Sequence, residues 1–82
     1  MNEPNISRYR FYDVFNVENG RISPRIPVRI GGVTMGPGVS FGGGVSFSGV
    51  DLAQHIDKDI AGYVENGVFI INGFYQWVRQ KN

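Results

Sequence analysis

The sequence predicts a mainly β (β-rich α+β) fold, either a small bent antiparallel barrel or a two-sheet sandwich of five to six strands, with one short helix near 51–57. Two observations predict this fold class. The uncharged stretch 30–50 alternates apolar residues with glycine, serine and threonine, which is the two-residue period of a β-strand. Asn-Gly occurs at 19–20 and at 66–67 between β-favouring runs, and this dipeptide is the strongest short signal for a hairpin.

The chain has 82 residues, enough for one domain, so we expect a disordered tail at 1–8 and a single small β domain at 9–82. It contains no cysteine and one histidine, which excludes disulfides and thiolate zinc sites, and no cofactor is expected. A domain this small buries only about 60–65% of its unfolded surface, so oligomerisation is an expected support. The polar N-terminus lacks the apolar region of a signal peptide; we expect a cytoplasmic protein with no membrane partner.

The first Asn-Gly turn predicts the register of the first hairpin, which is expected to start at Tyr9. A two-residue turn there sets Glu18 opposite Arg21, an attractive cross-strand pair. Pro27 would fall at a hydrogen-bonded position of this hairpin, where its missing N–H leaves a gap. Regular pairing is therefore expected to end near Arg25, and the chain to bend there toward another part of the sheet.

One face of this hairpin is expected to be basic. Arginine contacts phosphates bidentately, and an aromatic ring can stack on an unpaired base. The pattern therefore predicts single-stranded nucleic-acid binding as an alternative function, although the net charge of +1 is far below that of dedicated nucleic-acid domains. The residues expected on this face for nucleic acid are Arg10, Tyr12, Arg21, Arg25 and Arg29.

The stretch 31–50 is predicted to form a glycine-rich hairpin. A three-glycine loop pairs Phe41 with Val45, and the next pair along also matches apolar with apolar, leaving a bare glycine and serine face. The competing interpretation is one long strand that bends at the glycines and serves two sheets. A bare, uncharged face is a poor guard against edge pairing, so a partner strand or second subunit is expected. The predicted interface residues are Val39, Phe41, Val45, Phe47 and Trp77.

The second half of the chain is predicted to contain the short helix and another hairpin. Asp51 is a suitable N-cap for the helix at 51–57. The second Asn-Gly turn joins strands at 60–64 and 68–71, and the latter is apolar on both faces, which is typical of a central strand. The following Asn72-Gly73 predicts either a third turn or a β-bulge.

No motif in the sequence indicates an enzyme. There is no cysteine nucleophile or phosphate-binding loop, and Asp51, His55 and Asp57 match no metal-binding spacing, so no catalytic or metal residue is predicted. We therefore predict a non-enzymatic binding or assembly module that associates with itself through the glycine-rich hairpin, or with another protein. Nucleic-acid binding, and a small enzyme whose site is shared between subunits, remain alternatives.

Overall fold

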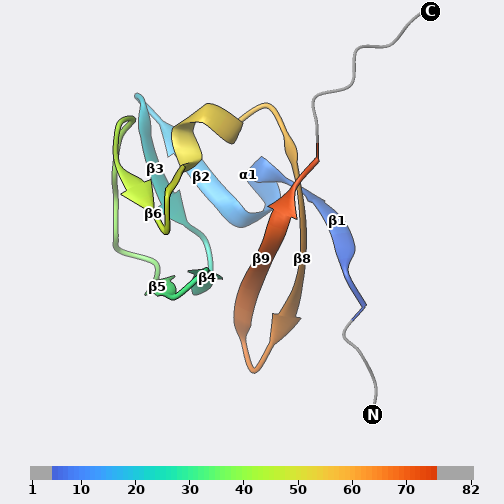
Figure 1. Cartoon of the computed structure of the whole chain (residues 1–82). Coiled ribbons are helices and arrows are strands. Elements are labelled where there is room, and N and C mark those ends of the chain that lie inside the picture. Colours follow the sequence, from blue (N-terminus) through green and yellow to red (C-terminus); the bar gives the residue numbers. More distant parts are fainter. Residues whose placement is uncertain (1–4, 76–82) are drawn as a thin grey trace, which may run out of the picture.

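The computed structural model describes residues 5–75 as a mainly β, sandwich-like domain (Figure 1). Five strands form the main sheet, in the order β1-β8-β9-β4-β5, and β2-β3 and β6-β7 form two-stranded sheets. The elements in chain order are β1 (Ser7–Arg10), α1 (Phe11–Val14), β2 (Phe15–Glu18), β3 (Arg21–Pro24), β4 (Val28–Ile30), β5 (Val33–Met35), β6 (Ser46–Phe47), β7 (Val50–Asp51), the 3-10 helix η1 (Leu52–His55), β8 (Asp59–Glu65) and β9 (Val68–Phe74).

The predicted fold class is confirmed in its sandwich-like form, since the strands of residues 5–75 do not close into a barrel. The short helix predicted near 51–57 is η1. Its N-cap is Asp51, as expected, whose Oδ1 accepts a hydrogen bond from the Ala53 N–H at 3.1 Å. The strands are more numerous than predicted, and β8 and β9 are longer than the predicted strands 60–64 and 68–71. In addition, β4 runs parallel to β9, whereas the other strand pairs of the described chain are antiparallel.

The predicted register of the β2–β3 hairpin is confirmed, beginning with Glu18 opposite Arg21. The backbone N–H of Arg25 makes the last hydrogen bond across this hairpin, at 2.8 Å. Pro27 lies beyond it, and its carbonyl accepts a hydrogen bond from the Phe69 N–H at 2.8 Å. The chain thus leaves the hairpin before the proline, as predicted, and continues into β4 of the main sheet.

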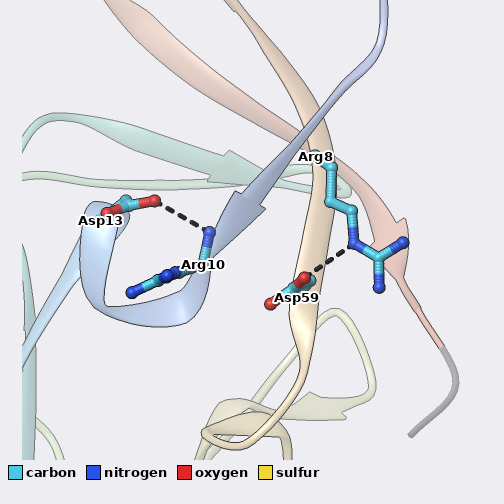
Figure 2. Close-up of polar contacts among 4 residues, drawn as sticks. All are labelled: Arg8, Arg10, Asp13 and Asp59. Carbon is cyan, nitrogen blue, oxygen red and sulfur yellow. Dashed lines mark hydrogen bonds and ion pairs between the residues drawn. The ribbon is translucent and has the colours of Figure 1, made fainter. Parts of the chain in front are cut away.

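The N-terminal arm differs from the expected continuous strand, because α1 interrupts it after Arg10. The Asp13 side chain accepts a hydrogen bond from the Arg10 N–H at 3.0 Å, which closes this helical turn (Figure 2). The turn also lets Phe11 and Val14, three residues apart, both enter the core, whereas a strand would place them on opposite faces. β1 pairs with β8 instead and begins at Ser7, so residues 7 and 8 belong to the sheet and not to the expected tail.

The glycine-rich stretch 31–50 forms neither the predicted hairpin nor one bent strand. Its ends form two separate tight hairpins, β4–β5 and β6–β7, and Phe41 makes an isolated bridge to Ile22 of β3. Gly38 and Gly44 on either side of Phe41 have φ values of 102° and 85°, which break an extended strand. The predicted pairing of Phe41 with Val45 is therefore wrong, because packing against β3 competes with it.

The β8–β9 hairpin agrees with its prediction. β9 lies between β8 and β4, so the strand that is apolar on both faces is central, as expected. The pairing shifts by one residue between Ala61 and Gly62, which leaves Asn72 without an opposite residue. Asn72-Gly73 is thus the predicted bulge and not a third turn.

The hydrophobic core fills the space between the main sheet and the elements on one side of it, which are α1, η1 and the β2–β3 hairpin (Figure 1). None of the fully buried residues in the described part of the chain is charged or polar. No helix within residues 5–75 has the length and apolar character needed to span a membrane. The buried residues are Phe11, Val14, Phe15, Ile22, Val28, Ile30, Met35, Phe41, Leu52, Ile60, Phe69 and Ile71.

Candidate interaction surface

The main sheet has one face in the core and a second face that no described element covers. On the core face, Phe69 and Ile71 of β9 are buried, while Val68 and Ile70, which alternate with them, are only partly buried. The same alternation on the neighbouring strands assigns the other members of this second face, which we call the open face. Its residues are Ile6, Arg8, Arg10, Arg29, Thr34, Asp59, Ala61, Tyr63, Glu65, Val68, Ile70 and Tyr75.

The centre of the open face is apolar. The register sets Tyr63 of β8 opposite Ile70 of β9, and Ile70 lies beside Arg29 of β4. Two residues before Ile70 on β9, Val68 lies opposite Glu65 of β8. Tyr63, Ile70 and Val68 thus form a partly exposed apolar patch with a cation on one side and an anion on the other.

Arg8 and Asp59, at one end of the open face, form an ion pair within the chain. The Arg8 Nε donates to Asp59 Oδ2 at 2.7 Å (Figure 2), and the Arg8 guanidinium lies 4.1 Å from the centre of the Tyr75 ring. This is the only salt bridge among residues 5–75. Arg29 and Glu65 therefore have no ion-pair partner within the described part of the chain.

Two of the residues predicted to bind nucleic acid lie together at α1. Arg10 and Tyr12 line a cavity of about 270 Å³, and the Tyr12 side chain is 51% exposed. Lys58 adds a cation to this cavity, but Asp57 and Asp59 add two anions. Its net charge is therefore close to zero, which gives little attraction to phosphate.

The other three predicted nucleic-acid residues are dispersed. The Arg25 Nε donates to the Tyr12 carbonyl at 2.8 Å, which places it beside α1. Arg21 is fastened to Ser40 by hydrogen bonds of 3.0 and 3.1 Å and lines a different, polar cavity of about 290 Å³. Arg29 lies on the open face.

The predicted interface residues divide between core and surface. Phe41 is 6% exposed and packs edge-on against Phe47, with ring centroids 4.8 Å apart. Val39 and Val45 are each 41% exposed, on the loops that flank Phe41. Trp77 lies outside the described residues.

His55 lies in an apolar contact with Phe74. Its ring is stacked on Phe74 at 4.2 Å, and its Nδ1 atom is buried without a hydrogen-bond partner. Both carboxylate oxygens of Asp51 accept hydrogen bonds from the backbone, from the N–H groups of Gly44 and Ala53. No three histidine, aspartate or glutamate side chains within residues 5–75 are grouped as a metal site.

The environment of His55 predicts a pH dependence of stability. Burial, with a further contribution from the Lys58 charge, lowers the pKa of His55 below its usual 6.5, while Asp51 acts in the opposite direction. Below pH 6.5 the unfolded chain therefore binds the proton more readily than the folded one, so stability falls as the pH drops through this range toward the folded-state pKa. Well above pH 6.5 the ring is neutral in both the folded and the unfolded chain, so His55 adds no pH dependence to the stability there.

The measurement is the free energy of unfolding in urea at about pH 7.5 and about pH 5.5 for the wild type and for His55→Phe, which keeps the stacking on Phe74. The wild type should lose more stability between the two pH values than the variant does. Equal losses would show that His55 does not contribute.

Sequence reasoning missed the open face, although one signal for it was present. The strand at 68–71 is apolar on both sides, a pattern of strands that are covered on both sides. The described chain covers only one of these two sides.

A scan against models of known protein families gave no match, and comparisons with curated proteins and with solved structures gave none either.

Proposed function

We propose that this chain is a non-enzymatic binding module, located in the cytoplasm, that uses the open face of its main sheet to bind a protein surface. The observation that carries the proposal is the apolar patch of Tyr63, Val68 and Ile70 on a central strand pair that is covered on one side only. Partly exposed aromatic and branched side chains on a central strand pair supply binding energy when a partner removes them from water.

The glycine-rich stretch contributes less to this proposal than the sequence suggests. Phe41 and Phe47 belong to the core or pack against it, which leaves Val39 and Val45 as its exposed large apolar residues. These two side chains lie on irregular loops and offer no continuous strand for a partner to pair with.

The test replaces Tyr63 and Ile70 together with serine and compares proteins captured from cell extract by the wild type and by this variant. Val39 and Val45 together changed to serine provide the matched control, since both are exposed apolar residues outside the open face. We expect the open-face variant to bind at least about tenfold more weakly, because burying each apolar side chain is worth about 1.5–3 kcal/mol. Partners retained equally by all three proteins would contradict the proposal.

A second candidate is weak binding of single-stranded nucleic acid at α1. The observation that favours it is the exposed Tyr12 ring, with Arg10 in the same cavity and Arg25 bonded to the Tyr12 carbonyl. Salt-dependent binding of an oligothymidine that survives the open-face substitutions but is lost in Tyr12→Ala would favour this candidate over protein binding.

A further inference from the structure

The open face leaves apolar side chains of the central strand β9 partly exposed to water. A central strand such as β9, with apolar residues on both sides, is usually packed on both sides. Within residues 5–75, the buried residues of α1, η1 and the β2–β3 hairpin belong to the same core cluster as Phe69 and Ile71, so these elements pack on that side of β9. Val68 and Ile70 thus remain partly exposed at the centre of the sheet.

Two charges without an ion-pair partner in the described chain, Arg29 and Glu65, lie on either side of Val68 and Ile70. Arg29 lies beside Ile70 on the β4 side of β9, and Glu65 lies opposite Val68 on the β8 side. The two residues are therefore on opposite sides of β9, at levels two residues apart along that strand. The point midway between them falls on β9 itself, between Val68 and Ile70.

This arrangement is complementary to itself. Two copies can pack with their open faces together, related by a two-fold axis that runs between the faces, over that midpoint and perpendicular to the line from Arg29 to Glu65. Such an axis places Arg29 of each copy against Glu65 of the other. In a symmetric dimer every contact occurs twice in this manner, with residue i on residue j and residue j on residue i. The same axis stacks the apolar patches of the two copies on each other.

We propose that the open face binds a second copy of this chain, related by a two-fold axis over β9, with Arg29 of each copy paired with Glu65 of the other. The inference rests on the proposed function, since it names the partner of the same surface. Val68, Ile70 and Tyr63 supply the dry centre of the interface, and the two ion pairs fix its register and orientation.

The charges of the open face favour a second copy over nucleic acid. Asp59 and Glu65 would repel phosphates, and the Arg8 guanidinium is already paired with Asp59. Arg29 and Glu65 have no ion-pair partner among residues 5–75, and they lie on opposite sides of β9 with opposite charges. Two opposite charges on opposite sides of a central strand attract the matching charges of a second copy placed in the opposite orientation.

The experiment is a charge exchange followed by light scattering over a concentration series. The variants are Arg29→Glu, Glu65→Arg and the double exchange, with Asp57→Lys as a control on an exposed acid outside the open face. We expect the wild type and the control to approach dimer mass at high concentration. Each single reversal faces two like-charge pairs, so its dimerisation should weaken at least about tenfold, and the double exchange should restore it.

Three outcomes would overturn the inference: a wild type that is monomeric at every concentration, a dimer that tolerates both single reversals, or a double exchange that does not restore association. If a reversal unfolds the chain, as judged by circular dichroism, Arg29→Gln and Glu65→Gln test the same pairs without like-charge contacts. A monomeric wild type that still captures a protein lost in the Tyr63 and Ile70 variant would refute self-association and leave the proposed function intact.

Discussion

Phe41→Asp is expected to unfold the domain. Phe41 is 6% exposed, bridges to Ile22 of β3 and packs against Phe47. Removing a buried phenylalanine costs about 3–5 kcal/mol, and an unpaired carboxylate in its place adds a desolvation penalty. Since small domains are stable by only about 5–15 kcal/mol, this loss takes most or all of the stability.

The matched control for this substitution is Val39→Asp, two residues away in the same stretch and 41% exposed. Its expected cost is below about 1 kcal/mol, because the new charge stays in water. Circular dichroism with a thermal melt, together with the solution mass, tells whether Phe41 belongs to the core or to an interface. A folded Phe41→Asp monomer would mean that Phe41 serves an interface, as the sequence suggested, and not the core.

Gly62→Ala is expected to produce the second largest effect. A Cβ atom at Gly62 would lie 2.6 Å from Cζ of Phe69 and closer still to the carbonyl oxygen of Ile70. The carbonyl belongs to the paired strand β9 and the ring is buried, so neither can move aside without disturbing the centre of the sheet. Overpacking of this kind costs about 1–3 kcal/mol, or more where backbone must shift.

Gly73→Ala is the control, because Gly73 lies across the same β8–β9 hairpin and a Cβ there meets no atom within 4 Å. We expect Gly62→Ala to lower the melting temperature by roughly 5–20 °C, on the scale of about 4–8 °C per kcal/mol for a domain of this size. The control should change it little. Equal melting temperatures for the two variants would contradict the close packing of Phe69 on Gly62.

Dimerisation through the open face would also bear on the stability of the monomer. A chain of 82 residues without disulfides has only a small hydrophobic core to stabilise it. A partner that covers Val68 and Ile70 adds buried apolar area to the folded state. The melting temperature of the wild type should then rise with protein concentration, whereas that of Arg29→Glu should not. This dependence links the proposed interface to the fold.

The sequence alone determined the features that depend on neighbouring residues. Both Asn-Gly turns form as predicted, with φ values of 53° at Asn19 and Asn66 and positive φ at the glycine that follows each, because these residues accept left-handed backbone at low cost. The register of each hairpin follows from its turn. The cap at Asp51 and the central place of the strand at 68–71 were predictable for the same reason, since both depend on short-range pattern.

The tertiary structure alone decided which distant segments meet. β1 pairs with β8 and does not extend the β2–β3 hairpin, and β4 pairs in parallel with β9. Phe41 bridges to Ile22 of β3 and does not pair with Val45 in its own glycine-rich stretch. These choices depend on which side chains fill one core together, a long-range packing energy that no local pattern carries. The open face has the same origin, since it is the side of the sheet that remains once α1, η1 and the β2–β3 hairpin have all packed on the other.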